Sequence, residues 1–160
     1  MQSDYDADAI GVDRFLALLA AKHVSSGVRV VADCGTAATV DVLDENDRHT
    51  GGVILPGLTM MRRSLRDGTD AVTPSEAARE DAAIEKGKRA ALAHDTQDAV
   101  EQGCHVALRS SIEDVVRKQQ AAEVVITGGD AETVRHADWY YRPHLVLEGL
   151  SHYASAAAQG

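Results

Sequence analysis

The sequence is poor in aromatic residues, cysteine and basic residues. It carries one Phe, one Trp and four Tyr among 160 residues, so alanine and aliphatic side chains must build its core. Its two cysteines, Cys34 and Cys104, are too few for a disulfide framework and lack the spacing of a metal site. Lys and Arg total 16 against 25 Asp and Glu, which gives a net charge of −9 without any long basic run. This balance excludes the electrostatic footprint of a nucleic-acid-binding protein.

Long apolar runs are missing as well. No stretch approaches the roughly 18 uninterrupted apolar residues of a membrane span, and residues 1–15 lack the basic and then apolar pattern of a signal peptide. Together with the cysteine count, this predicts a reduced, cytoplasmic protein with no membrane partner. The hydrophobic share of 44% and the charged share of 26% are those of an ordinary globular protein. A compact chain of this length buries about 70% of its unfolded surface, which is enough for one core.

The apolar pattern divides the chain into a polar N-terminal arm at residues 1–9 and a single domain at residues 10–160. Its period changes between the spacing of helices and that of strands. It predicts the following elements: a helix at 10–23, a three-stranded meander at 28–32, 39–43 and 50–55, a helix after Pro56-Gly57, a loop with a short helix at 67–94, a helix at about 96–119, a strand at 124–127, a short helix near 131–137, a short strand at 144–147 and a helix at 148–157.

This order is the layout of a ribonuclease-H-like domain. Three antiparallel strands followed by alternating helices and strands predict an α/β fold with a central mixed sheet flanked by helices. Kinases of the actin, Hsp70 and sugar-kinase superfamily contain two such halves and bind ATP between them. We therefore expect a single actin-like ATPase domain, which corresponds to one of the two halves of such a kinase.

The segment from Asp33 to Asp41 carries the first chemical signal. A buried strand ends in Asp33, turns at Gly35 and then presents hydroxyl groups, beginning with Thr36. A turn of this kind could hold phosphate oxygens on its backbone N–H groups and on Thr36, with a cation on Asp33. The alternative is a hairpin turn whose polar side chains satisfy local N–H groups. Cys34 within the turn is interpreted as a small buried residue rather than a nucleophile.

Three further segments carry signals that are weak when taken singly. Residues 11–14 place an acid beside an arginine at a helix start. The acid could serve as a base and the arginine could bind an anion. The alternative is that the acid only complements the helix dipole. Residues 127–131 contain a double glycine after a buried strand. Glycines there would let a flat ring or a phosphate come close to the backbone. The alternative is a strand-to-helix turn with Asp130 as the N-cap. The glycines of residues 51–57 indicate close backbone packing, a pocket wall or ordinary turn chemistry.

Taken together, these segments resemble the type III pantothenate kinase family. That family has, in order, a Gly-Ala-Asp-Arg helix start, an Asp-x-Gly-Thr-Ala-x-Thr-x-Asp hairpin, a Gly-Gly-x-Ile-x-Pro-Gly segment, a Thr followed by an acid-Ala pair, and a Thr-Gly-Gly-Asp-Ala turn. The matching segments here are residues 11–14, 33–41, 51–57, 96–99 and 127–131, and residues 145–150 also fit. The resemblance covers about residues 5–150, with Val12 in place of the family's alanine.

The resemblance implies ATP-dependent phosphorylation of pantothenate, the first committed step to coenzyme A. It implies a general base, a pantothenate pocket, an ATP site and a monovalent cation site that binds K⁺ or NH₄⁺. It also implies magnesium with the ATP and a homodimer with the pantothenate pocket near its interface. The residues that carry these roles over are Asp13 as the base, Gly11, Val12, Asp13, Arg14 and Thr96 for pantothenate, Gly35, Thr36, Gly128 and Gly129 for ATP, and Asp33 for the cation.

The main departure from the family pattern concerns the N-terminal half of the family's proteins. In the family that half carries an Asp-x-Gly-Asn-Thr loop that holds ATP phosphates, and no such loop precedes Asp13 here. We expect one of three explanations: a partner chain supplies that half, the sequence is truncated, or the half present has a changed role. The alternative function is therefore a non-catalytic accessory protein that binds pantothenate or nucleotide, because relatives of these kinases include accessory factors for toxin-gene expression. A non-functional fragment is the third hypothesis.

Overall fold

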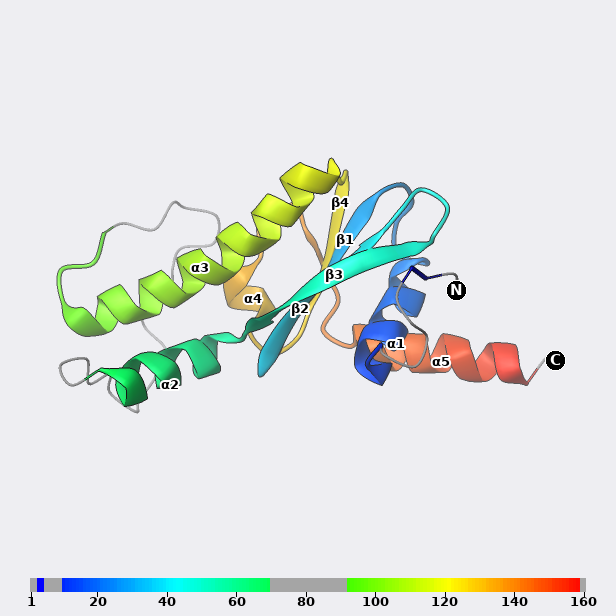
Figure 1. Ribbon diagram of the computed structural model, residues 1–160. Helices are drawn as coiled ribbons and strands as arrows, with labels where there is room; N and C mark the ends of the chain where they lie inside the picture. The colour runs from blue at the N-terminus through cyan, green and yellow to red at the C-terminus, as the bar shows by residue number, and fades with distance from the viewer. Residues whose placement is uncertain (1–2, 5–9, 70–91, 159–160) are drawn as a thin grey trace.

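The computed structural model describes residues 3–4, 10–69 and 92–158, which form a mixed five-stranded sheet between two layers of helices (Figure 1). The strands are β1 Arg29–Cys34, β2 Ala37–Leu43, β3 His49–Pro56, β4 Glu123–Thr127 and β5 Tyr140–Tyr141. They lie in the order β3-β2-β1-β4-β5. The first three form an antiparallel meander, and β4 and β5 run parallel to β1. The predicted mixed sheet flanked by helices is confirmed.

The helices divide between the two faces of the sheet. They are α1 Val12–Ala21, α2 Leu58–Gly68, α3 Thr96–Gln119, α4 Ala131–Val134 and α5 Leu145–Ala157. Helices α2, α3 and α4 contribute to the core on one face, and α1 and α5 cover the other face (Figure 1). Helix α2 and the first half of α3 extend beyond the sheet as an arm, the α2–α3 arm, at the end opposite to α1 and α5.

The period of two residues along the strands explains why both faces are covered. Val30 points into the core with Leu108 and Ile112 of α3, whereas its neighbour Val31 joins Leu18 of α1 and Leu145 of α5. All six side chains are buried. A strand buried on both faces reads as a continuous apolar run, which is the pattern that the valine-rich segment showed.

The register of β1 and β4 positions the candidate site. These strands are parallel and pair Arg29 with Glu123 at one end and Asp33 with Thr127 at the other. Their carboxyl ends therefore meet at the same edge of the sheet. The turn after β1 and the double-glycine turn after β4 lie side by side there, although 94 positions separate Asp33 from Thr127 in the sequence. In open α/β sheets this edge is where ligands bind.

The predicted elements match the observed ones within a few residues, with one exception. The strand predicted at 144–147 is wrong: a two-residue strand occurs earlier, at β5, and α5 begins at Leu145. A short apolar run fits a strand or a helix equally well. Burial decides between them, because Leu145 and Gly149, four residues apart, are the buried residues of α5. Most of the predicted loop at 67–94 and of the arm at 1–9 lies outside the described residues.

A glycine sets the contact between α1 and α5. A Cβ atom on Gly149 would overlap the backbone carbonyl of Leu16, so the two helices touch backbone to backbone at this point. Leu145, one turn earlier, is fully buried in the same layer. Within the residues described, no helix combines the length and apolarity needed to cross a bilayer.

Candidate active site

A pocket of about 320 Å³ opens at the carboxyl ends of β1 and β4. It is lined by Asp33 near the end of β1, by the turn after β4, and by the segment that leads into and begins α5. Its lining residues are Asp33, Thr127, Gly128, Gly129, Tyr141, Pro143, His144, Val146 and Leu147. The fold thus brings two of the sequence-predicted segments, residues 33–41 and 127–131, to one site. The third contribution, residues 141–147, was not predicted to line the site: residues 145–150 fit the family resemblance, but their composition alone indicates no binding role.

Gly128 is required for this juxtaposition. Its φ is +97°, in the left-handed region that glycine enters freely. A Cβ atom there would lie 2.5 Å from the carbonyl carbon and oxygen of Cys34 and 2.6 Å from Oδ1 of Asp33. The next glycine differs, because a Cβ atom on Gly129 would meet nothing within 4 Å. Gly128 therefore lets the turn pack against Asp33, whereas Gly129 faces open space in the pocket wall.

The two acids singled out from the sequence lie near one another. Burial raises the pKa of the half-buried Asp33 carboxyl above its ordinary value, and the negative charge of Asp13 raises it further. The first turn of α1 therefore places Asp13 close enough to Asp33 for their charges to repel. A cation held beside Asp33 would relieve that repulsion, which makes this carboxylate a suitable ligand for a hard cation. The described residues contain no cluster of three or more His, Cys, Asp or Glu suited to a metal ion.

The turn between β1 and β2 is braced by the segment of residues 51–57. The backbone N–H of Gly57 donates to the carbonyl oxygen of Thr36 at 3.0 Å. A Cβ atom on Gly57 would overlap the carbonyl of Gly35. Of the interpretations offered for residues 51–57, close backbone packing is therefore correct at Gly57. The side chain of Thr36 is exposed at this turn, where a ligand can reach its hydroxyl.

Arg14 lies in a buried network that sequence reasoning missed. Its Nε and Nη2 atoms donate to Oδ2 and Oδ1 of Asp41 at 3.0 and 2.6 Å. The Nε2 atom of His49 lies 2.8 Å from the same Oδ1, and its Nδ1 atom lies 2.9 Å from Oγ of Ser3. Arg14, Asp41 and His49 are all buried. The bidentate pair holds the first turn of α1, which carries Asp13, onto strand β2.

A glycine makes room for this network too. A Cβ atom on Gly52 would overlap the Asp41 carboxylate. Asp41 alternates with Val40 and Val42 along β2 and therefore lies on the opposite face of the sheet, which is also buried, beneath α1. The signal that could have found the pair is the glycine paired with Asp41 on the next strand.

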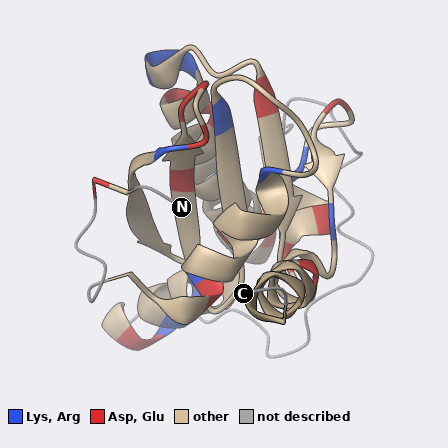
Figure 2. Ribbon diagram, turned by 90° about the vertical axis from the view of Figure 1, so that its right-hand side faces the viewer, with Lys and Arg blue, Asp and Glu red and all other residues tan. Residues whose placement is uncertain are grey.

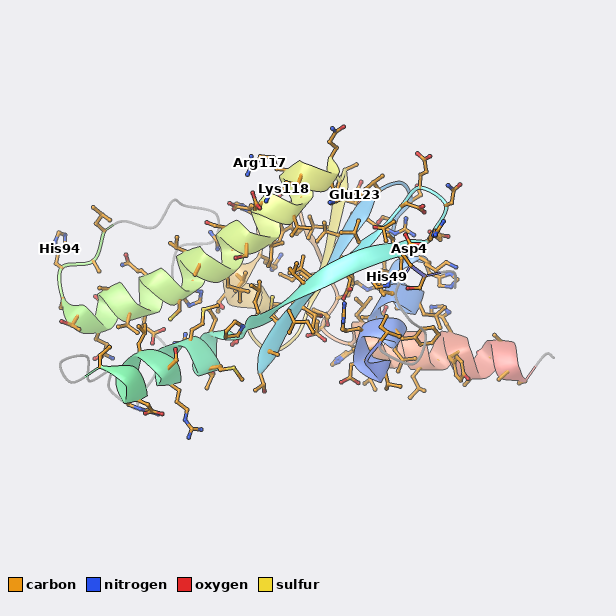
Figure 3. All side chains as sticks on the ribbon, in the orientation of Figure 1. Asp4, His49, His94, Arg117, Lys118 and Glu123 are labelled. Atoms are coloured by element: carbon orange, nitrogen blue, oxygen red, sulfur yellow. The ribbon has the colours of Figure 1, made fainter. Side chains whose placement is uncertain are left out.

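Thr96 is the predicted site residue that the fold does not bring to the others. It is the first residue of α3, whose N-cap Asp95 accepts a hydrogen bond from the backbone N–H of Asp98 at 2.8 Å. The start of α3 lies at the tip of the α2–α3 arm. Figure 3 shows His94 there, at the opposite end of the molecule from His49 and α1. Arg62 of α2 braces the arm through an ion pair with Glu101 of α3.

Cys34 is buried at the end of β1 and is no candidate nucleophile. Burial raises the pKa of its thiol to about 12, with further contributions from the charges of Asp33 and Asp130. A thiol with that pKa is not ionised at neutral pH. The interpretation of Cys34 as a small buried residue is therefore confirmed. Asp130 occupies the N-cap position of α4, but its side chain makes no capping hydrogen bond.

The family model for type III pantothenate kinase matches residues 1–118. A type III pantothenate kinase from Pseudomonas aeruginosa (strain LESB58) is 38% identical over 159 residues, which cover 91% of this chain and 60% of that protein. One from Azoarcus sp. (strain BH72) is 35% identical over 167 residues, which cover 99% of this chain and 59% of that protein. The chain thus spans about 60% of the length of the curated relatives that it matches.

Solved structures support the fold independently. A Baf family transcriptional activator from Campylobacter jejuni superposes with a TM-score of 0.67 at 21% identity, over 98% of this chain and 69% of that one. The activator of 2-hydroxyisocaproyl-CoA dehydratase from Clostridium difficile, solved with bound ADPNP, gives a TM-score of 0.56 at 13% identity, over 92% of this chain and 67% of that one. At these identities the likeness shows the shared fold alone. The family match and the curated relatives show more: the chain belongs to the type III pantothenate kinase family.

Proposed function

We propose that this chain carries the base and cation side of a pantothenate kinase active site, which transfers the γ-phosphate of ATP to the pantothenate hydroxyl and yields 4′-phosphopantothenate. The observation that carries the proposal is that the Asp33 carboxyl lies against the Gly128 turn and is affected by the charge of Asp13, in a chain that belongs to this kinase family. A non-catalytic accessory role is not favoured, because the curated relatives are kinases.

In the proposed reaction Asp13 accepts the proton of the pantothenate hydroxyl group while the hydroxyl oxygen bonds to the γ-phosphorus of ATP. The bond from that phosphorus to the bridging oxygen breaks, and ADP leaves with the electron pair. Phosphoryl transfer depends on positioning and on neutralising charge more than on covalent chemistry. The ion pair between Arg14 and Asp41 supports this by fixing the helix turn that carries Asp13. Gly11 and Val12, which precede Asp13, are proposed to line the pantothenate pocket with it.

The nucleotide side of the proposed site lies along the turns after β1 and β4. Gly129 leaves room for a nucleotide to approach the backbone, and Gly128 packs the same turn against Asp33. Thr36 offers an exposed hydroxyl to phosphate, and Gly35 shapes its turn. Magnesium bound to ATP would neutralise phosphate charge, and Asp33 is proposed to hold a monovalent cation, K⁺ or NH₄⁺. The described residues that line the pocket include no Lys or Arg, so cations would be needed to balance the phosphates.

We further propose that the working enzyme is a homodimer in the cytoplasm. Thr96 stands at the tip of the α2–α3 arm and cannot reach Asp13 of its own chain (Figures 1 and 3). A second copy packed along the arm would bring its Thr96 toward the pantothenate pocket, as the family resemblance implies. Exposed apolar side chains on the arm support this, among them Met60 and Leu65 of α2 and Val106 of α3.

Thermal unfolding of the chain in the presence of ligands tests the proposed site. A ligand that binds the native state raises the melting temperature by mass action. We expect ATP with magnesium to raise it more in KCl than in choline chloride of equal ionic strength. Asp33→Asn should abolish that difference between the salts, whereas Asp13→Asn should retain it. Equal shifts in both salts for the unaltered chain would contradict the cation assignment.

A further inference from the structure

Helix α1 carries the proposed base in a first turn that its own N-cap does not hold. The N-cap is Gly11, which makes no side-chain capping hydrogen bond. Gly11, Val12 and Asp13 are exposed, and Arg14 is the first buried residue of the helix. The first N–H groups of a helix have no partner within it, and helix ends fray. The position of Asp13 therefore depends on what holds Arg14.

His49 completes the group of side chains that holds Arg14. Charged residues are sparse along the strands, which Figure 2 draws mostly in tan, and Asp41 is the charged residue of β2. Its carboxylate accepts from Nε and Nη2 of Arg14. Because a carboxylate only accepts, Nε2 of His49, 2.8 Å from Oδ1, carries a proton and donates it. A buried ion pair is stable when further hydrogen bonds satisfy its lone pairs, and the fully buried His49 supplies one.

A β-bulge directs His49 toward Asp41. Asp41 of β2 pairs with Gly52 of β3. Leu43, two residues later on β2, pairs with His49, three residues earlier on β3, so the register shifts by one residue between these pairs. Paired residues lie on the same face of a sheet, and Leu43 shares its face with Asp41. Without the shift His49 would lie on the opposite face. Gly51, with a φ of +131°, adopts the backbone conformation that the bulge requires.

The other ring nitrogen of His49 is held by the N-terminal residues. Its Nδ1 atom lies 2.9 Å from Oγ of Ser3, whose hydroxyl can donate to an imidazole that is protonated on Nε2. The backbone N–H of Asp4 donates to the carbonyl oxygen of His49 at 2.9 Å, and Asp4 pairs with Arg48. Figure 3 shows Asp4 and His49 together at the end of the molecule that carries α1. Residues 3–4 thus cover the start of β3 and fix the orientation of the ring.

We propose that His49 is a positioning residue for the base: through Asp41 and Arg14 it holds the first turn of α1 in place, and so fixes where Asp13 meets the substrate hydroxyl. Bulges beside active sites are known to re-aim a side chain in this way. A misplacement of about 1 Å can cost roughly 10²-fold in rate, so a residue that touches no ligand can still affect turnover. This inference rests on the proposed function, because it is there that Asp13 acts as the base.

Hydrogen exchange of single backbone amides tests the hold on α1 without a ligand. The N–H of Phe15 donates to the carbonyl oxygen of Gly11 at 3.0 Å, and the N–H of Ala99 donates to that of Asp95 at 3.0 Å. Each bond joins the N-cap carbonyl to the first turn of its helix, α1 or α3, so the two amides are matched. Their exchange rates report local opening and are compared by NMR in the 160-residue chain.

Two substitutions at one position separate the two nitrogens of the ring. Glutamine places its amide where Nε2 was and can still donate to Asp41, whereas the shorter asparagine reaches only the place of Nδ1. We expect His49→Asn to speed exchange at Phe15 by about tenfold and to leave Ala99 within about twofold. His49→Gln should return Phe15 to within about threefold of the unaltered chain. Equal rates at Phe15 in the two variants, or equal acceleration at Phe15 and Ala99, would overturn the proposal.

A substitution outside the core keeps the proposal falsifiable should His49→Asn fail to fold. Ser3 belongs to neither core cluster and contacts the ring of His49 from the other side. Ser3→Ala should speed exchange at Phe15 by about two- to fivefold and leave Ala99 unchanged, because the ring loses one of its two supports. An unaltered rate at Phe15 in this variant would count against the proposal as decisively as the result above.

Kinetics connect the hold on α1 to turnover. A joined polypeptide, in which this chain replaces the matched region of the Pseudomonas aeruginosa relative, is assayed for ATP-dependent phosphorylation of pantothenate. We expect His49→Asn to lower kcat by roughly tenfold or more and to leave KM for ATP within about twofold, because the proposed nucleotide side lies along other turns. His49→Gln should recover kcat.

The two sets of measurements separate this inference from the proposed function. Faster exchange at Phe15 with an unaltered kcat would overturn the positioning role of His49. A joined polypeptide that phosphorylates no pantothenate, with His49 in place, would refute the kinase proposal alone, since the exchange rates need no ligand.

Discussion

At the scale of single residues, the candidate site combines a carboxylate whose ionised form destabilises the folded chain with a glycine that packs closely against it. Asp33 is a half-buried carboxylate whose ionised form is disfavoured by burial and by the charge of Asp13. Gly128 adopts a backbone conformation that other residues rarely enter, and it does so to lie against Asp33. Such local conflicts are typical of functional sites, where stability is given up for a geometry that binds a ligand.

The raised pKa of Asp33 predicts a pH dependence of stability. Between the ordinary value of 3.8 and the higher folded-state pKa, the native chain binds more protons than the unfolded chain. Stability therefore falls as pH rises through that window, and the loss is complete above the folded-state pKa. Asp33→Asn removes this loss, so without added cations it should raise the free energy of unfolding at pH 7 and leave it nearly unchanged below pH 4, as measured by urea titration.

The control for that prediction is an exposed acid with the opposite surroundings. Hydrogen bonds from Lys118 and Arg117, together with their positive charges, lower the pKa of Asp114. Asp114→Asn should therefore bring no gain in stability at pH 7. A gain of equal size from both substitutions would show that general relief of the net charge of −9 is responsible, rather than the position of Asp33.

Two neighbouring glycines give a second prediction at this scale. Gly128→Ala places a Cβ atom against Cys34 and Asp33 and forces alanine into the left-handed region, so it should cost at least about 1 kcal/mol from the backbone alone. Gly129→Ala meets open space and should leave the free energy of unfolding nearly unchanged. Chemical unfolding of both variants is the measurement, and equal losses would contradict the packing described for the turn.

At the scale of elements, helix contacts depend on where glycine lies. Gly149 allows α5 to touch the backbone of α1 at Leu16, whereas Gly103 lies on the exposed side of α3 with free space around it. The same substitution should thus have opposite effects. Gly149→Ala should destabilise the chain by separating α5 from α1. Gly103→Ala should stabilise it by about 0.5–1 kcal/mol, because alanine favours a helix interior. Melting temperatures that change in the same direction would contradict this account of the α1–α5 contact.

The elements also show how far sequence reasoning reaches. Strands β1, β2 and β4 and helix α3 were predictable, because the apolar runs of β1 and β4, the alternation along β2 and the length of the α3 segment identify each of them. The run from Leu145 to Leu147 was too short to distinguish a strand from a helix. The burial of Asp41 with Arg14 was not predictable either. Partners from a helix and a strand meet only in the folded chain, and an acid on an alternating strand ordinarily indicates a solvent-facing side.

For the candidate site, the motifs identified which segments carry chemistry, and the fold shows which of them meet. Asp33 and Gly128 are brought together by the parallel pairing of β1 with β4. Thr96 belongs to the same family pattern but is held away by the α2–α3 arm, and only a three-dimensional description reveals this. The pocket wall formed by Tyr141 to Leu147 was not predicted as part of the site. Residues 145–150 fit the family resemblance, but the composition of this stretch alone does not indicate that it lines a pocket.

At the scale of the whole molecule, the chain is a three-layer domain with chemistry at one edge and two exposed apolar regions at opposite ends. One region is the α2–α3 arm, proposed to meet a second copy, and the other is the exposed side of α5, with Leu147, Leu150 and Tyr153. The described residues that line the pocket include one acid, Asp33, and two glycines, but no Lys or Arg. Phosphates bound there as proposed would therefore depend on cations for their charge balance.

The central claim is that Asp13 serves this chain as the base for pantothenate phosphorylation. The most direct test uses the same joined polypeptide, in which this chain replaces the matched region of the Pseudomonas aeruginosa relative. Its rate of ATP-dependent 4′-phosphopantothenate formation is measured with and without Asp13→Asn. We expect turnover with Asp13 in place, and a loss of roughly 10²–10⁴-fold in kcat for Asp13→Asn, the range typical of a removed general base. The melting temperature should be unchanged. A variant that folds and phosphorylates pantothenate at the unaltered rate would contradict the account.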